Sequence, residues 1–515
     1  MKDTESDTSV EGSSCFSELH RAIRDKYVNT TITFILIMGF LYLLISSVYG
    51  RNILHPLSGD NEVFSENMTN NVVSVFVLLV SALAFGWILS VIRLPPLFGA
   101  LLVGIAFRNI PLLSETFRFD ENWLNLIRVA SLSCMMPKWG LSIRWLEIKR
   151  RPFLPLTVGI LTPIAEAASI GVASHLIFGM DLSISFLAGF LLAAVSPAIT
   201  VPVLLDLQND GRGENKVVPG LLAAATLDNV VCLFSITVAM TSIFSQDTPS
   251  GTLFHIILQI FTGLVAGVAF GVLLWFFPLS SNANSGLIRS VILAAAASAA
   301  FFGFNAVRWT CTGIISSLLL SFVASCRWKV DNDRGTKTQE NIAENLWALL
   351  FLPLLFSSIG MRLDLENLEK STVLWSLALI GIGQVARFLS TLVLSLFSLN
   401  VKESLFVAFS MLPKATVQAA LGPSLLGYIA LFPEMGDQLN AIVTTAIITI
   451  FLTAPIGQLL IQVLAPLLLR RESPNIPTYI YNHYENDQRL EDKDIILNGI
   501  GAKSFIKADE VSLRF

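Results

Sequence analysis

Long apolar runs separated by short polar segments repeat along most of this 515-residue chain. A helix needs about 20 apolar residues to cross the hydrocarbon core of a bilayer. The runs therefore predict an all-α polytopic membrane protein with 14 spanning helices, or 13 if one of the impure runs does not cross. The predicted spans are 32–50, 72–92, 95–110, 123–143, 153–178, 183–205, 217–245, 252–278, 287–306, 310–327, 343–361, 372–398, 401–430 and 438–469.

The composition excludes a soluble protein of this length. Hydrophobic residues make up 53% of the chain and charged residues only 14%, whereas soluble domains carry about 25% charged residues. The net charge of −4 provides no positive field for nucleic acid. The five cysteines are scattered without the spacing of a disulfide framework or a metal site. Membrane lipid is therefore an expected partner, and nucleic acid is not.

The loops predict an orientation. If the amino terminus is cytoplasmic, most loop Lys and Arg residues fall on the cytoplasmic face, as the positive-inside rule requires. The chain then divides into a cytoplasmic segment (1–30), a transmembrane domain (31–470) and a cytoplasmic tail (471–515). A plasma membrane and an organelle membrane fit this pattern equally. In this orientation Asn67 begins an Asn-Met-Thr sequon in an outside loop, which predicts N-glycosylation there.

Two apolar runs contain prolines where a spanning helix should be continuous. Pro197 and Pro202 interrupt the first run, and Pro413 and Pro423 interrupt the second. A proline inside a helix removes an amide donor and clashes with the carbonyl one turn back. One such run is typical of a kinked helix, but paired interruptions in two halves of a chain indicate a secondary transporter with inverted repeats and a site at the breaks. Three polar side chains beside the breaks are candidate ion ligands: Thr200, Thr416 and Gln418.

Four charged residues stand inside apolar runs, where a charge costs about 2.5 kcal/mol or more. They are Glu166, Asp228, Arg387 and Lys414. Glu166 and Arg387 each belong to the helix before a break, and their opposite charges predict an ion pair, with a purely structural role as the alternative. Asp228 is too short to snorkel, and its neighbour Asn229 offers a second oxygen ligand. A buried carboxylate beside cations can exchange a proton for a metal cation, and that competition at one site suffices for antiport.

Three segments carry a family resemblance. Residues 195–202 read VSPAITVP, residues 227–229 read LDN, and residues 411–423 read MLPKATVQAALGP. They resemble the NHA-type sodium/proton antiporters, the sodium/hydrogen exchanger 9B-like subgroup of the cation:proton antiporter family, and the likeness covers about 72–470. The resemblance implies NhaA-like inverted repeats with two crossed broken helices. It also implies a homodimer in which a core domain slides against a dimerisation domain to give alternating access.

The resemblance further implies roles for single residues. Asp228 matches the first acid of the family's paired aspartates. Arg387 matches the basic partner on a later core helix, and Glu166 matches its acidic counterpart. Lys414 matches the lysine of the second break. These charge partners are expected to surround the ion.

Three positions depart from the family pattern, and each change removes negative charge. Asn229 stands where relatives carry an acid, Arg144 where they carry an aspartate, and Arg362 where they carry a glutamate. The first hypothesis is exchange of Na⁺ or Li⁺, with K⁺ as a further candidate, for H⁺, with the cation held by Asp228, Asn229 and the Thr200 hydroxyl. The alternative keeps the fold but moves an anion, chloride, together with a proton.

Two other functional classes fit less well. An intramembrane enzyme would need a serine–histidine or paired-aspartate arrangement at membrane depth, which the sequence lacks, so no catalytic residue is expected. A channel would show flux that is not coupled to protons. No ATP-binding sequence is present, so ion gradients would drive transport and no cofactor is expected. A G-x-x-x-G repeat predicts a close helix contact, with a dimer interface as one candidate, at Gly263, Gly267 and Gly271.

Overall fold

The computed structural model describes residues 62–471 apart from 118, 144, 214–216, 246–248, 279–284 and 332, together with eight residues between 28 and 40. Every regular element in this part of the chain is a helix, and one isolated β-bridge joins Arg212 to Arg471. The predicted all-helical fold is therefore confirmed. Most of the predicted N-terminal segment, almost all of the tail, and Arg144 lie outside the described residues.

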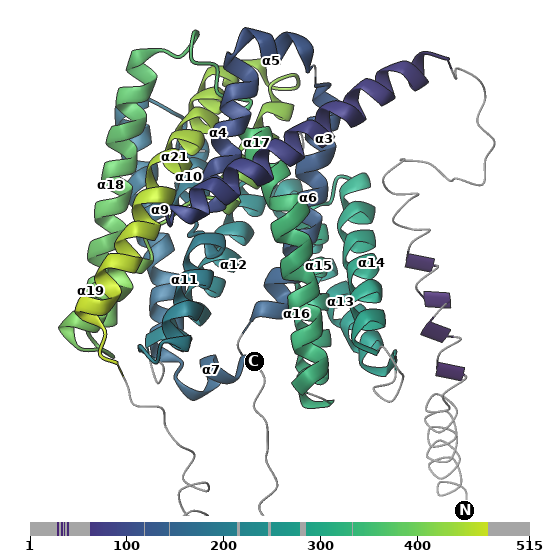
Figure 1. The fold of residues 1–515 in the computed structure, drawn as a ribbon, viewed down its shortest axis with the longest axis vertical. Helices are drawn as coiled ribbons and strands as arrows, with labels where there is room; N and C mark the ends of the chain where they lie inside the picture. The colour runs from purple at the N-terminus through teal and green to yellow at the C-terminus, as the bar shows by residue number, and fades with distance from the viewer. Residues whose placement is uncertain are drawn as a thin grey trace, which may run out of the picture.

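The helices form two packing groups (Figure 1). The first group, called the scaffold helices below, consists of α3 (Glu62–Val91), α4 (Pro96–Asn109), α6 (Glu121–Ser142), α13 (Pro249–Phe276), α14 (Ser285–Ala306), α15 (Thr310–Asp331), α16 (Asp333–Leu346), η2 (Trp347–Phe351) and α17 (Leu352–Gly360). The second group, called the core helices, consists of α8 (Phe153–Leu156), η1 (Thr157–Leu161), α9 (Thr162–Phe178), α10 (Leu182–Ala193), α11 (Pro197–Asn209), α12 (Val217–Ile243), α18 (Lys370–Ser395), α19 (Val401–Ser410), α20 (Thr416–Leu421), η3 (Gly422–Tyr428) and α21 (Gly436–Leu468). Short elements connect them: α5 (Pro111–Thr116), α7 (Trp145–Arg150) and η4 (Pro433–Met435).

Contacts are dense within each group and sparser between the groups. Among the scaffold helices, α13 packs along α15 and α4 packs against both α3 and α17. Among the core helices, α9 packs between α10 and α18, and α21 packs on α18 and α19. The contacts between the groups join α12 to α13 and α15, α20 to α6 and α17, and α21 to α4. The interface between the groups therefore passes beside α12 and α20.

Ten segments of the described chain are long and apolar enough to cross a membrane. Four of the 14 predicted spans are absent from this set. The run 32–50 lies mostly outside the described residues, α4 has only 14 residues, α6 carries Arg128 and Lys138, and the run 401–430 is divided among α19, α20 and η3. The total of 14 spans stays a prediction.

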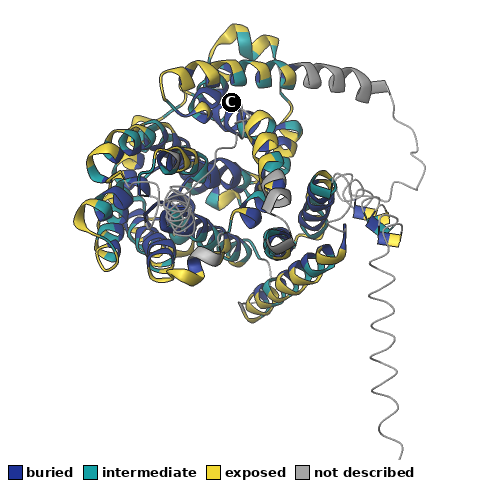
Figure 2. Ribbon diagram, turned by 60° about the horizontal axis from the view of Figure 1, so that its bottom comes forward, coloured by how far each residue is buried: buried dark blue, intermediate teal, exposed yellow. Residues whose placement is uncertain are grey.

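The outer surface of the bundle is apolar. In α13, the side chains of Leu253, Phe254 and Phe261 are each about three-fifths exposed, at 59%, 63% and 63%. Figure 2 shows exposed residues along the outward faces of the helices and buried residues toward the interior. A helix that is apolar on its inner and outer faces suits a lipid surrounding.

The predicted close helix contact is confirmed, and it lies within one chain. The G-x-x-x-G repeat of α13 packs against α15. A Cβ on Gly267 would lie 2.8 Å from Leu319 Cβ, and a Cβ on Gly271 would lie 2.6 Å from Val323 Cβ. These glycines therefore allow two scaffold helices to approach closely, and their side of α13 faces α15 rather than a second copy.

The helix that holds the glycosylation sequon is longer than predicted. The hydrophobic run suggested a start at residue 72, but α3 begins at Glu62, so Asn67 lies on helical backbone rather than in a loop. The polar residues at the start of this helix gave no apolar signal. The Asn67 side chain lies outside the described residues, and its glycosylation stays a prediction.

Candidate functional site

The first predicted interruption lies between α10 and α11. α10 ends at Ala193, residues 194–196 are not helical, and α11 begins at Pro197. Proline suits the first position of a helix because its missing amide hydrogen would have no helical acceptor there. Pro202 lies inside α11. The interruption leaves the last carbonyls of α10 without partners in their own helix.

The second interruption separates α19 from α20. α19 ends at Ser410, residues 411–415 are not helical and include Pro413, and α20 begins at Thr416. After α20 the backbone tightens into the 3₁₀ turn η3, which contains Pro423 near its start. Pro197, Pro413 and Pro423 therefore lie at or beside two stretches of irregular backbone, whereas Pro202, which was expected to interrupt the first run, lies within the continuous helix α11.

The two interruptions touch each other, although they are more than 200 residues apart in the sequence. The backbone N–H of Ser196 donates to the carbonyl of Pro413 at 2.9 Å. The hydroxyl oxygens of Ser196 and Thr416 lie 3.4 Å apart. Each stretch thus satisfies polar groups of the other, which irregular backbone inside a membrane requires.

Side chains of the second interruption cap the carboxyl end of α10. Lys414 Nζ donates to the carbonyl of Ala193. Gln418 Nε2 lies 2.9, 3.3 and 2.9 Å from the carbonyl oxygens of Leu191, Leu192 and Ala194. These are carbonyls that a helix terminus leaves unpaired, and the negative end of the helix dipole favours an ammonium group there.

α21 supports the second interruption from the other side. The Thr453 hydroxyl accepts the backbone N–H of Lys414 at 3.0 Å. A Cβ at Gly457 would collide with the ring of Pro413. Thr453 and Gly457 were not predicted as site residues. Threonine and glycine are common in apolar helices, so their role becomes visible only when the helix is seen packed against the second interruption. The spacing of Thr445, Thr449 and Thr453 on one helix face was the available signal.

Four buried charges gather where the interruptions meet. Glu166 is 1% exposed, and Asp228, Arg387 and Lys414 are fully buried. Lys414 Nζ donates to Glu166 Oε2 at 2.7 Å, and Arg387 Nη1 lies 3.5 Å from the same oxygen, so the predicted Glu166–Arg387 ion pair is present. Arg387 Nη2 also pairs with Asp228 Oδ2. Asp228 Oδ1 accepts the amide of Val195, which lies in the first interruption, at 3.0 Å.

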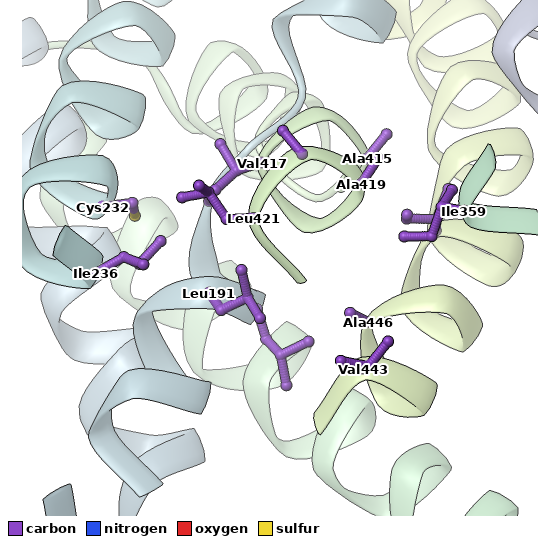
Figure 3. Close-up of a cluster of buried hydrophobic side chains, with 14 of the residues drawn as sticks. Leu191, Cys232, Ile236, Ile359, Ala415, Val417, Ala419, Leu421, Val443 and Ala446 are labelled. Atoms are coloured by element: carbon purple, nitrogen blue, oxygen red, sulfur yellow. The ribbon is translucent and has the colours of Figure 1, made fainter. Parts of the chain in front are cut away.

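The four charges balance within apolar surroundings. Two carboxylates face one guanidinium and one ammonium, so the cluster is neutral when all four groups are ionised. Figure 3 shows α20 enclosed by apolar side chains, among them Leu191, Ile236, Ile359 and Val443. Buried ion pairs are costly to break because the remaining partner keeps an uncompensated charge. An entering cation therefore has to replace a positive charge that is already present.

The two neutral candidate ligands have different surroundings. The Asn229 amide donates from Nδ2 to the Ala225 carbonyl at 2.8 Å, while its buried Oδ1 has no hydrogen-bond partner among the described residues. The Thr200 hydroxyl donates to the Ser196 carbonyl at 3.1 Å, one turn back along α11. Asn229 Oδ1 is thus an available oxygen next to Asp228 in the sequence, and a buried unpaired oxygen suits a cation.

Two basic residues of the scaffold helices and of the turn after α17 lie in ion pairs outside the cluster. Arg362 Nη2 pairs with Glu121 Oε2. Lys138 Nζ lies 2.7 Å from Glu344 Oε2 and 5.4 Å from the centre of the Trp347 ring. These bases therefore add no charge to the four-residue cluster. No group of three or more His, Cys, Asp and Glu side chains that could hold a metal occurs in the described part of the chain.

Sequence comparisons with known proteins agree on one family, and a solved structure matches the fold. The family pattern described as "Sodium/hydrogen exchanger, transmembrane" matches residues 75–465. Sodium/hydrogen exchanger 9B1 of Macaca fascicularis is 31% identical over 410 residues, which cover 78% of this chain and 79% of that protein. Sodium/hydrogen exchanger 9B2 of Mus musculus is 30% identical over 411 residues, covering 78% and 74% respectively. The structure of the sodium proton antiporter MjNhaP1 from Methanocaldococcus jannaschii at pH 8 matches with a TM-score of 0.63 and 16% identity, covering 78% of this chain and 99% of that one.

Proposed function

Because this chain belongs to the sodium/hydrogen exchanger family and is an integral multi-pass membrane protein, we propose that it exchanges Na⁺ or Li⁺ for H⁺, with K⁺ as a further candidate. The observation that carries this proposal is the buried, balanced cluster of Glu166, Asp228, Arg387 and Lys414 at the meeting point of two interrupted helices. No cofactor takes part in the exchange.

The cation binds at Asp228 in this proposal. One Asp228 oxygen is held by the Val195 amide, and the other is paired with Arg387. Asn229 Oδ1 supplies a neutral oxygen, and the Thr200 hydroxyl lies one turn into the adjoining helix α11. When a cation enters, it weakens the hold of Arg387 on Asp228. A proton on the Asp228 carboxylate and a monovalent cation bound there each add one positive charge to the cluster, so the arrival of one cation favours the loss of that one proton.

Movement of the core helices against the scaffold helices gives alternating access in this proposal. The sparse contacts beside α12 and α20 support it, because they leave a plane along which the two groups can shift. The interrupted helices are the crossed pair of an NhaA-like inverted repeat, and two copies pair through their scaffold helices. The transmembrane domain extends over 31–470, with both termini in the cytoplasm.

Chloride transport is the weaker alternative. It was based on the positive charge of Arg144 and Arg362 and on the neutral Asn229. Arg362 is engaged by Glu121 outside the cluster, and Arg144 lies outside the described residues. The charges that do gather form a cluster that is neutral when all four groups are ionised, so it offers no excess positive charge to an anion.

Ion substitution in proteoliposomes tests the proposal. Purified protein is reconstituted with an acid interior and a fluorescent pH dye, and sodium, lithium, potassium or choline salts are added outside. The expected result is that sodium or lithium dissipates the pH gradient and choline chloride does not. Dissipation by choline chloride equal to that by sodium gluconate would establish chloride coupling and overturn the proposal. Asp228→Asn vesicles, which should be inactive, provide the matched control.

A further inference from the structure

A buried arginine in the scaffold helices lacks a full set of partners. Arg128 lies in α6, two turns after Glu121, and only 6% of its surface is exposed. Its Nε donates to the Leu124 carbonyl at 3.2 Å, but its buried Nη1 has no hydrogen-bond partner within the part of the chain that the structure describes. A guanidinium stays protonated in proteins. Arg128 is therefore a permanent, buried positive charge with an N–H group to offer.

A second guanidinium, that of Arg362, adds another positive charge near Arg128. Arg362 follows α17, and its charge acts on Arg128 repulsively, whereas that of Glu121 acts attractively. Arg362 Nη2 pairs with Glu121, but its own buried Nε also lacks a partner among the described residues. Two guanidinium groups thus share one carboxylate, and two buried N–H donors remain unused.

No acid among the described residues forms an ion pair with Arg128. The Glu121 side chain is 68% exposed and already engaged by Arg362, so water screens its effect on Arg128. The other ion pair at this end of the bundle, Arg108 with Asp364 at 3.1 Å, is complete in itself. An excess of one positive charge therefore remains beside Arg128, and a buried unpaired charge is strongly unfavourable.

The identity of residue 362 decides this excess, and in this chain residue 362 is arginine. A carboxylate at that position would neutralise Arg128 from within the protein. With arginine there instead, the negative charge has to come from solution.

We propose that Arg128 and Arg362 bind one monovalent inorganic anion of the chloride type, at the end of the scaffold helices that carries α5 (Figure 1). A single negative charge restores neutrality, and a spherical ion accepts N–H groups from two directions without a fixed geometry. The site belongs to α6 and the turn after α17, whereas the Asp228 cluster belongs to the core helices. The anion is a bound component of the scaffold and is not carried across the membrane, so this proposal goes beyond the cation exchange and does not depend on it.

Thermal unfolding at constant ionic strength tests this site. The purified protein is melted in detergent while chloride replaces gluconate in steps. The expected result is a saturable rise in Tm of about 2 °C. Arg362→Glu, which supplies the missing carboxylate, should raise Tm in gluconate and remove the response to chloride. Arg128→Gln should remove the response as well. Arg108→Gln, which alters only the neighbouring exposed pair, is the matched control and should keep it.

Three outcomes would overturn the site. They are a wild-type Tm that does not respond to chloride, a response that persists in both Arg128→Gln and Arg362→Glu, and a response that Arg108→Gln also removes. Because Arg128→Gln and Arg362→Glu change different helical segments, misfolding of one still leaves the other as a test. Sodium-dependent proton flux, measured on the same variants, reports separately on the proposed exchange.

Discussion

Neutralising Glu166 is expected to destabilise the protein through the charge that remains. In the wild type, Glu166 accepts Lys414 Nζ at 2.7 Å and lies 3.5 Å from Arg387 Nη1. Glu166→Gln keeps the size of the side chain but leaves two buried cations facing Asp228 alone. Breaking a buried pair in this way costs about 3–5 kcal/mol. Lys414→Met, which leaves two carboxylates facing one guanidinium, should cost a similar amount.

The double variant should cost less stability than the two single variants added together. Glu166→Gln with Lys414→Met removes one charge of each sign, so the cluster returns to neutrality. We expect an interaction energy of about 2–3 kcal/mol between the two sites.

Thermal melts in detergent, followed by tryptophan fluorescence, measure this cycle. Each single variant should lower Tm by about 4–8 °C, since the shift per kcal/mol becomes smaller as a chain lengthens. The double variant should lower Tm by less than the two single shifts added together. Single variants that cost less than about 1 kcal/mol, or a double variant with the summed cost of both, would show that these groups are not a coupled, desolvated cluster.

Three further predictions concern other parts of the molecule. Asn229→Asp should raise the apparent affinity for sodium in the proteoliposome assay, and an unchanged ion profile would remove Asn229 from the ion site. Gly271→Leu should lower the free energy of unfolding by about 1–3 kcal/mol or more, because the new side chain would overlap α15. Gly381→Leu is the control: this position has open space around it, so the free energy of unfolding should change by less than about 0.5 kcal/mol. Equal effects of the two substitutions would refute the packing explanation. A hydrogen bond from the Asn367 side chain holds the pKa of Asp364 below its usual value of 3.8 in the folded state. The ionised Asp364 carboxylate therefore stabilises the folded protein above pH 3.8, and this stabilisation is lost as the pH falls through the folded pKa. Asn367→Ala should therefore flatten the dependence of Tm on pH between about 5 and 2, and an unaltered profile would contradict this assignment.

The sequence was sufficient to identify the unusual residues one at a time. Glu166, Asp228, Arg387 and Lys414 stood out because a charge in an apolar run is costly. The prolines located both interruptions because proline removes a backbone donor wherever it lies. These signals are local, so they could be recognised without knowing the fold.

The pairing of these residues needed the tertiary structure. The sequence predicted an ion pair between Glu166 and Arg387. In the structure Glu166 lies closer to Lys414, at 2.7 Å, than to Arg387, at 3.5 Å. The capping of the carboxyl end of α10 by Gln418 joins segments that are more than 220 residues apart, and no local pattern encodes such a contact. Arg128 was hidden in a run that otherwise reads as a spanning helix, although a single arginine in such a run is itself a signal.

Proton release on sodium binding tests the central claim most directly. Purified protein in weakly buffered detergent solution receives sodium gluconate, and a pH indicator reports the protons released per protein. Competition between a cation and a proton at the Asp228 cluster predicts release from the wild type and none from Asp228→Asn. Sodium binding to the wild type without proton release, or equal release from Asp228→Asn, would contradict it.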